Sequence, residues 1–184
     1  MLEKAIARPE AVRVAMINEV VPADPADDFF AGGEYFRCAL ALFAQAGLKA
    51  QSADELMLRG VYLTNAVKRP KAQSAVPLAE IQASLPALEA ELDGFANLRA
   101  VMLMGDVARK AFNLIAKKRG GKNALPAAST YRLRGGEHYA LGLRVYPSYI
   151  MTGPNLLIEP GKVALIVEDI RRMLGDLDIE RSNL

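Results

Sequence analysis

An amide and a carboxylate stand side by side after the first apolar segment of the chain. Residues 12–17 are apolar except for Arg13, and they are followed by Asn18, Glu19 and a loop with two prolines and Phe29-Phe30. The same loop carries three further carboxylates, Asp24, Asp27 and Asp28. Proline stiffens such a loop, so that acids and aromatic faces are presented together. The loop is either a candidate catalytic segment or a solvated acidic loop with one phenylalanine in the core.

A second amide, Asn65, follows another apolar segment, and the basic residues Lys68, Arg69 and Lys71 come soon after it. A side-chain amide offers a donor and an acceptor in fixed geometry, which is what reading a base edge requires. The cations beyond it are suited to phosphates. The alternative is an ordinary polar cap at the end of a strand.

The third segment begins at Tyr146 and contains Ser148, Ile150 and Met151 between prolines. The hydroxyl groups are suited to holding a phosphate, and the apolar pair is suited to wedging into a stack of bases. A proline-rich turn that packs its apolar residues inward is the competing interpretation.

The elements that position these residues alternate between strands and helices. Short apolar runs predict buried strands at residues 12–17, 61–65, 98–104 and 140–145. Apolar spacing and capping signals predict helices at 34–46, from Ser52, at 78–92, at 105–118 and at 161–174. Pro86 is expected to break the third helix, with Ser84 capping the second half.

This alternation predicts an α/β protein, a three-layer α/β/α sandwich with a central, mostly parallel four-stranded sheet. In such sheets ligands bind beyond the carboxyl ends of the strands, which is where the three segments stand. No repeat or change in composition marks a second domain, so residues 1–184 are expected to form a single domain.

Composition narrows the function classes. A hydrophobic content of 52% and a mean hydropathy of +0.10 exclude a disordered chain, and no apolar run approaches the ~18 residues of a membrane span. The start of the chain lacks a secretion signal, so a cytoplasmic location is expected. The single cysteine, Cys38, excludes an internal disulfide and a cysteine-rich metal site within one chain, and neither metal nor cofactor is expected. The net charge of +2 neither indicates nor excludes nucleic acid.

Taken together, the segments resemble the uracil-DNA glycosylase superfamily over roughly residues 12–174, most closely the branch whose other members carry an iron–sulfur cluster. The strongest match is 64–70, Thr-Asn-Ala-Val-Lys-Arg-Pro, against Thr-Asn-Val-Val-Lys-Cys-Arg-Pro. Residues 18–22 stand at the Gly-Glu-Ala-Pro-Gly loop, and 30–32 at Phe-Val-Gly. Residues 104–111 are similar to the Leu-Gly-Ala-Thr-Ala segment, and 146–149 to His-Pro-Ser-Tyr.

The departures from the family pattern are specific. The family's cysteine is absent between Lys68 and Arg69, a later cluster cysteine is replaced by Ser84, and the amino-terminal Cys-x-x-Cys is missing. A cluster therefore cannot form. Tyr146 stands where the family has histidine, and Asn18 stands where its catalytic loop begins with glycine.

The resemblance implies roles in base recognition and bond cleavage. Phe30 would stack on a uracil flipped out of the duplex, and Asn65 would pair with its O4 and N3–H edge. Glu19 would orient or deprotonate the attacking water and stabilise the cationic sugar, with Asn18 as a partner for the same water. Asp24, Asp27 and Asp28 are competing candidates for this carboxylate. Tyr146 would donate to uracil O2 as the base leaves.

The resemblance also implies a DNA interface. Four residues would contact phosphates, namely Lys68, Arg69, Lys71 and Ser148. Ile150 and Met151 are the wedge candidates, with core packing as the alternative.

The sequence therefore predicts a monomeric DNA repair glycosylase that acts on uracil-containing DNA, without cofactor or membrane, and leaves an abasic site. One alternative is a module of the same fold that binds uracil or abasic DNA with little turnover. Another is an unrelated α/β enzyme acting on a small nucleotide, although neither Gly-x-Gly-x-x-Gly nor Gly-x4-Gly-Lys-Ser/Thr is present.

Overall fold

A mostly parallel sheet organises the part of the chain that the computed structural model describes, residues 8–153, 156 and 160–180. Within these residues the sheet has five strands in the order β2-β1-β3-β5-β4. Their bounds are β1 Val14–Val21, β2 Val61–Pro70, β3 Ala100–Met104, β4 His138–Ala140 and β5 Leu143–Ser148. The pairs β1–β2, β1–β3 and β3–β5 are parallel, and β4–β5 is antiparallel.

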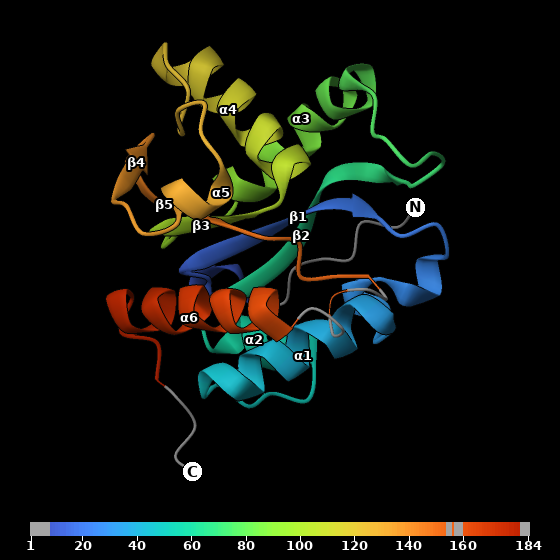
Figure 1. Cartoon of the computed structure of the whole chain (residues 1–184), viewed down its shortest axis with the longest axis vertical. Helices are drawn as coiled ribbons and strands as arrows, with labels where there is room; N and C mark the ends of the chain where they lie inside the picture. The colour runs from blue at the N-terminus through green and yellow to red at the C-terminus, as the bar shows by residue number, and fades with distance from the viewer. Residues whose placement is uncertain (1–7, 154–155, 157–159, 181–184) are drawn as a thin grey trace.

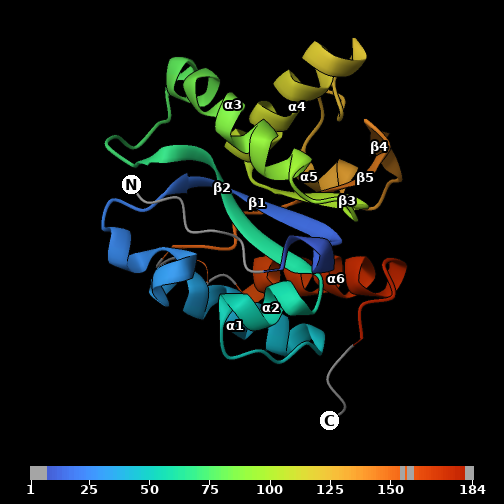
Figure 2. The same ribbon diagram turned by 180° about the vertical axis from the view of Figure 1, so that it is seen from behind.

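Helices cover both faces of the sheet (Figure 1). One face carries α1 (Glu34–Ala46), α2 (Ala53–Leu58) and α6 (Pro160–Asp176), and the other carries α3 (Leu78–Asp93) and α4 (Asp106–Gly120). The short α5 (Thr130–Leu133) precedes β4, and 3-10 turns occur at Pro9–Ala11, Pro25–Asp27 and Phe29–Ala31. Seen from behind, β2 runs along the edge of the sheet with α3 on one side and α2 on the other (Figure 2). The predicted three-layer α/β/α sandwich is confirmed.

The strands separate two apolar layers because side chains alternate between the faces of a strand. Val14 and Met16 pack with α1 and α6, whereas Ala15 and Ile17 pack with α3 and α4. All four side chains are fully buried, as expected for strands covered on both faces.

The predicted count of four strands is wrong because residues 140–145 are not one strand. Leu141 and Gly142 have φ angles of 53° and 77° and form a tight turn between β4 and β5. Two consecutive left-handed residues are typical of two-residue hairpins. The apolar run therefore crosses a hairpin, and β4 becomes an antiparallel edge strand.

Three strands extend further at their carboxyl ends than expected, and candidate residues consequently lie inside them: Asn18 and Glu19 in β1, Asn65, Lys68 and Arg69 in β2, and Tyr146 and Ser148 in β5. Asn18 pairs in register with Asn65. Their side chains are consequently held by a parallel ladder.

The third helix is continuous, and the predicted break at Pro86 is wrong. Ile81 and Leu88, on either side of Pro86, are both buried in the layer against β2, so one apolar face holds the helix together. Ser84 does not cap a helix, and its Oγ instead accepts a hydrogen bond of 3.1 Å from the amide of Lys68 in β2. At Ser52 the predicted cap is confirmed, with Oγ accepting from the amide of Glu55 at 3.1 Å.

In the ranges described, no helix is both long enough and apolar enough to cross a membrane.

Candidate functional site

A directional chain of hydrogen bonds lies at the carboxyl ends of β1 and β2. Thr152 Oγ1 donates to Asn18 Oδ1 at 3.3 Å, and Asn18 Nδ2 donates to Asn65 Oδ1 at 2.9 Å. Asn65 Nδ2 then donates to Asp28 Oδ1 at 3.0 Å. Asn18 and Asn65 are only 1% and 5% exposed, so both amides are fixed in one orientation by their partners.

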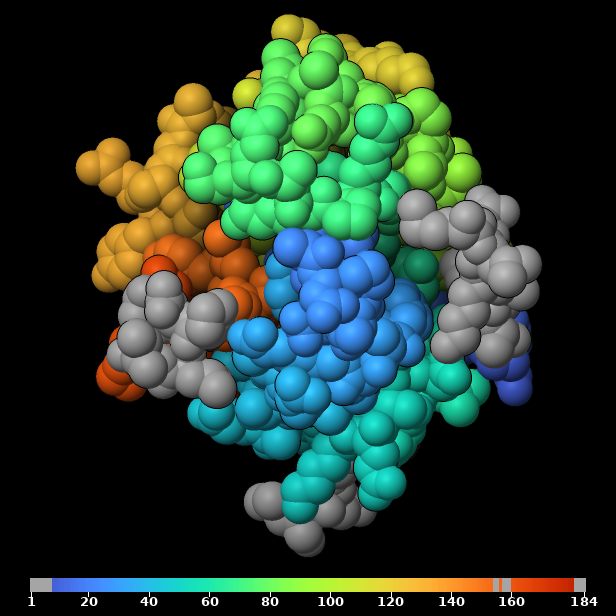
Figure 3. Space-filling model, turned by 90° about the vertical axis from the view of Figure 1, so that its right-hand side faces the viewer, coloured from blue at the N-terminus to red at the C-terminus, as the bar shows by residue number. Residues whose placement is uncertain are grey.

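Three loops converge on this chain. Figure 3 faces the edge of the molecule where the loop after β1, in blue, lies between the segment after β2, in green, and the segment after β5, in orange. Asp28 comes from the first of these loops and Thr152 from the third. Residues far apart in sequence are thus assembled at one edge of the sheet, as parallel topology predicts.

Glu19 points to the opposite face of β1 and binds the start of α4. Its Oε1 accepts from the amide of Val107 at 3.1 Å. Gly105, the residue before α4, has no side chain to cap the helix, so the Glu19 carboxylate takes that place at the positive end of the helix dipole. Burial raises the pKa of Glu19, the Val107 hydrogen bond lowers it in part, and the charge of Asp106 raises it.

Gly105 allows this close approach. Its φ is 98°, and a Cβ there would lie 2.4 Å from Glu19 Oε1 and 2.6 Å from Cγ1 of Ile150. Glycine alone combines an unstrained positive φ with the absence of a Cβ that would overlap these two side chains. The contact places the carboxylate against the main chain between β3 and α4.

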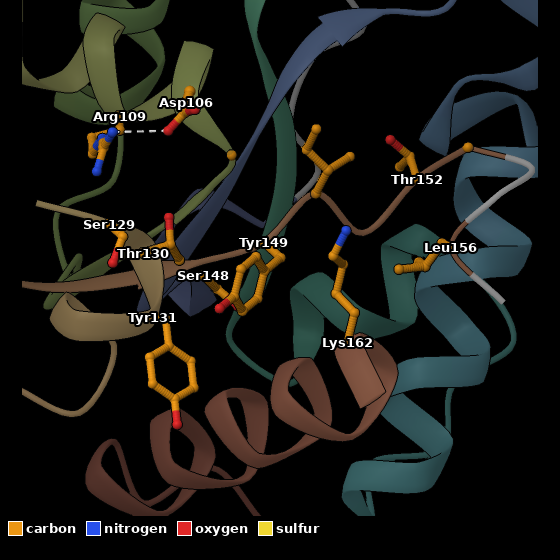
Figure 4. Close-up of a pocket in the computed structure, with 13 residues that line it drawn as sticks. Asp106, Arg109, Ser129, Thr130, Tyr131, Ser148, Tyr149, Thr152, Leu156 and Lys162 are labelled. Atoms are coloured by element: carbon orange, nitrogen blue, oxygen red, sulfur yellow. Dashed lines mark hydrogen bonds and ion pairs between the residues drawn. The ribbon is translucent and has the colours of Figure 1, made fainter. Parts of the chain in front are cut away.

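A cavity of about 550 Å³ adjoins the site, a volume suited to a nucleotide-sized group. Arg109, Tyr131 and Lys162 contribute side chains from α4, α5 and α6, and Arg109 pairs with Asp106 (Figure 4). Gly105 and Thr152 also line the cavity. Glu19 and Asn18 do not line the cavity themselves, but Gly105 packs against Glu19 and Thr152 bonds Asn18, so two lining residues connect the cavity to the candidate catalytic residues.

The structure does not bring Tyr146 to this site. Its ring is buried with the α1 and α6 layer, and its hydroxyl donates to Asp176 Oδ2 at 2.8 Å. Asp176 is the last residue of α6, a 17-residue helix that begins after the β5 loop and is roughly 25 Å long. Burial raises the pKa of Tyr146, with Asp176 contributing, so the phenol is a neutral donor committed to Asp176.

The other candidates from this segment differ in exposure. Ser148 is 1% exposed and its Oγ donates to Asp169 at 2.8 Å, although the residue lines the cavity. Met151 is fully buried in the α1 and α6 layer, which agrees with the core-packing alternative. Ile150 is 39% exposed at the cavity and remains placed as a wedge would be.

The aromatic residues of the first loop divide between core and surface. Phe29 is buried and its ring lies 5.6 Å from that of Tyr35. Phe30 is 38% exposed, with its ring 5.9 Å from Tyr62 on the edge strand. Asp28, two residues before Phe30, is the residue of this loop that contacts Asn65.

The basic residues after Asn65 differ in their surroundings, since one is paired with an acid and two are exposed to solvent. Lys68 Nζ donates to Glu91 Oε2 at 2.7 Å and to Thr64 Oγ1 at 2.8 Å, and burial lowers its pKa. Arg69 and Lys71 are exposed at the end of β2. The charge of Lys71 also makes a small contribution that lowers the pKa of Glu19. Arg69 and Lys71 are therefore the cations of this run that face solvent.

Sequence reasoning missed several residues of the site. From the sequence, Asp28 is one of three carboxylates that compete with Glu19 for the catalytic role, and neither Asp28 nor Thr152 is predicted to contact the amides. The pair Leu103-Met104 before Gly105-Asp106 signals a strand that turns directly into a helix, so Gly105 was detectable. Thr152 was not, because a threonine in an irregular loop carries no periodic signal. Asp24 proves to be a local cap, accepting from the amide of Ala26 at 2.9 Å.

Among the residues that the structure describes, no group of three or more histidine, cysteine, aspartate or glutamate side chains is arranged to hold a metal ion.

Comparison with family models gives a match to the uracil DNA glycosylase superfamily over residues 22–170. The matched region contains Asn65, Asp28, Thr152 and the whole of α4, and it begins three residues after Glu19. Comparison with curated proteins gives no match.

Proposed function

The chain belongs to the uracil DNA glycosylase superfamily, and from this premise we propose that it hydrolyses the N-glycosidic bond of uracil in DNA. Membership indicates a glycosylase-type hydrolase that acts on DNA. Uracil as the base, flipping of the base and an abasic product in base excision repair are our proposal. We also propose that the protein acts as a monomer in the cytoplasm.

The observation that carries the proposal is a half-buried carboxylate, Glu19, that follows directly after an amide bonded to Asn65. Glu19 and Asn18 are consecutive residues of β1, and Asn18 is bonded to Asn65 at 2.9 Å. Cleavage of a glycosidic bond develops positive charge on the sugar, which a carboxylate stabilises best where water is excluded. Glu19 is half-buried, so it is partly shielded from water, and the amide of Val107 at the start of α4 orients its carboxylate.

In the proposed reaction, Glu19 orients the attacking water and accepts its proton. Asn65 donates its remaining N–H to O4 of the flipped base, and Asn18 keeps the Asn65 amide in the orientation that makes this possible. Arg69, Lys71 and the cavity beside α4 accommodate the DNA backbone, and Phe30 and Ile150 contact bases. The role of Tyr146 as the leaving-group donor requires that its hydroxyl leave Asp176.

One observation favours a second candidate, a module that binds uracil or abasic DNA with little turnover. The Tyr146 hydroxyl is engaged at the far end of α6, so the site contains Glu19 without an evident donor for the departing base. Such a site retains recognition and loses part of the rate enhancement.

The test is release of uracil over many turnovers. The protein is incubated with single-stranded and double-stranded oligonucleotides that carry one uracil, and abasic sites are then cleaved with alkali. Strand scission that exceeds the amount of protein supports the glycosylase. Tight, uracil-dependent binding without scission supports the binding module. If the protein neither cleaves nor binds uracil DNA, the proposal is wrong.

A further inference from the structure

We propose that Asp28 is a specificity-determining residue, which together with Asn65 reads the –C(=O)–NH– edge of a base; this inference rests on the proposed function. The two side chains are joined by the 3.0 Å bond from Asn65 Nδ2 to Asp28 Oδ1. Neither family membership nor the sequence motifs give Asp28 this role.

The first step is the direction of the hydrogen-bond chain. Every donor points the same way, from Thr152 to Asn18, from Asn18 to Asn65, and from Asn65 to Asp28. A carboxylate accepts and cannot donate when ionised. Asp28 therefore terminates the chain, and a rotation of either amide would bring two acceptors or two donors together.

The second step concerns which atoms remain for a base. Asn65 Oδ1 already accepts from Asn18 Nδ2, within a pair that is 1% and 5% exposed. Asn65 retains one N–H, and the half-buried Asp28 retains an oxygen beside it. The adjacent pair offered to a base is thus an amide donor and a carboxylate acceptor.

The third step is the match to base edges. Uracil presents an acceptor, O4, next to a donor, N3–H, and this pattern fits the Asn65 donor and the Asp28 acceptor. Cytosine presents a donor amine next to the acceptor N3, so that N3 would face a carboxylate. Hypoxanthine has the same acceptor–donor edge as uracil. The pair therefore selects deaminated bases over their amino-bearing parents.

The charge of Asp28 influences several neighbouring groups. Burial lowers the pKa of Lys68 and the charges of Glu91 and Asp28 raise it in part, while burial raises the pKa of Tyr35 and of Tyr62 with a smaller contribution from Asp28. Glu91, bonded to Lys68 on the other side, is the second acid of this group. Asp28 therefore belongs to a group of charged residues that includes Lys68 and Glu91, and within it Asp28 is the acid that bonds the Asn65 amide.

The experiment compares Asp28→Asn with the unchanged protein on oligonucleotides that carry uracil or cytosine at one position, by binding and by alkali cleavage. An asparagine has nearly the same shape as aspartate but carries both a donor and an acceptor, so it can pair with the edge of uracil or with that of cytosine. We expect the preference for uracil over cytosine to fall about tenfold or more, because a mispaired buried polar group is costly. Asp27→Asn removes the same charge from the same loop and is the matched control, with unchanged preference expected.

The outcomes separate this inference from the proposed function. Uracil release by the unchanged protein with an equal base preference in Asp28→Asn would overturn the role of Asp28 and leave the glycosylase intact. A protein that neither binds nor cleaves uracil DNA would overturn both. Asp28→Ala removes the acceptor and adds no donor, and its unfolding transition shows whether the variant still folds. We expect a cooperative unfolding transition, weaker uracil binding and unchanged cytosine binding. Loss of all DNA binding would count against the role of Asp28.

Discussion

The ends of β1 and β2 and the end of β5 carry similar side chains and use them differently. At β1 and β2, the amides of Asn18 and Asn65 bond each other across the strands, and Asn65 bonds Asp28 of the loop after β1. At β5, Tyr146 and Ser148 are each bonded to an aspartate of α6. Asn18, Tyr146 and Ser148 are all 1% exposed, so the two regions differ in their hydrogen-bond partners and not in burial. A polar side chain at the end of a strand is less available to a ligand when an acid of a helix already bonds it, as at Tyr146 and Ser148.

The largest expected effect tests the β1 side of this contrast. Glu19→Gln keeps the bond to the Val107 amide and removes the base, so we expect uracil release to fall about 10²- to 10⁴-fold. The measurement is the single-turnover rate. A rate within threefold of the unchanged protein would remove Glu19 from the chemistry.

The same substitution has a defined effect on stability. Burial raises the pKa of Glu19 above its ordinary value of 4.5. The ionised carboxylate therefore lowers the free energy of unfolding at neutral pH, and this penalty disappears below the unfolded-state pKa. Glu19→Gln should be at least as stable as the unchanged protein at pH 7, with the difference vanishing near pH 4. Thermal unfolding at both pH values measures it.

A pH profile is the next test of Glu19. Water activation needs the ionised carboxylate, so the rate should fall about tenfold per pH unit below its raised pKa. The inflection of the single-turnover rate is expected above pH 4.5, and the same limb should be absent from the residual activity of Glu19→Gln. An identical limb in both proteins would place the titrating group elsewhere.

A smaller effect separates two kinds of cation on β2. Replacing both Arg69 and Lys71 with alanine should weaken DNA binding about tenfold and reduce the slope of log affinity against log salt by about two. Lys68→Ala should instead reduce stability, because it leaves Glu91 without its 2.7 Å partner. A salt slope that changes with Lys68 and not with the pair would reverse this assignment.

The smallest expected effect is on the β5 side. Tyr146→Phe removes the bond to Asp176 and should cost about 1 to 2 kcal/mol of stability while uracil release stays within threefold. Loss of a leaving-group donor would instead lower the rate by about 10²-fold or more. Paired measurements of thermal unfolding and single-turnover rate distinguish the two.

The layers of the fold were predictable because strands buried on both faces are short apolar runs. The hairpin was not, since Ala140 to Val145 reads as one such run and only Gly142 signals the turn. The break predicted at Pro86 was wrong because buried residues on both sides of the proline pack against the sheet, and this packing outweighs the local effect of proline on the helix. Sequence order placed Asn18, Glu19 and Asn65 correctly at one edge, since parallel strands end together.

The partners of the site residues were beyond the sequence. Nothing in the order of residues indicates that α6 delivers Asp176 to Tyr146 and Asp169 to Ser148. Asp27 and Asp28 are adjacent residues of the same type, so the sequence does not distinguish them; the fold shows that Asp28 is the one bonded to Asn65. Side-chain partners between distant elements depend on three-dimensional register, which local patterns do not encode.

The contact at Gly105 limits how this protein can evolve. Since no Cβ fits between Glu19 and Ile150, substitutions at position 105 are closed to the lineage as long as the carboxylate stays in place. The next residue, Asp106, meets no such steric limit, because its side chain is 81% exposed, although it pairs with Arg109 and its charge raises the pKa of Glu19. The packing limit at the junction of β3 and α4 is therefore confined to Gly105.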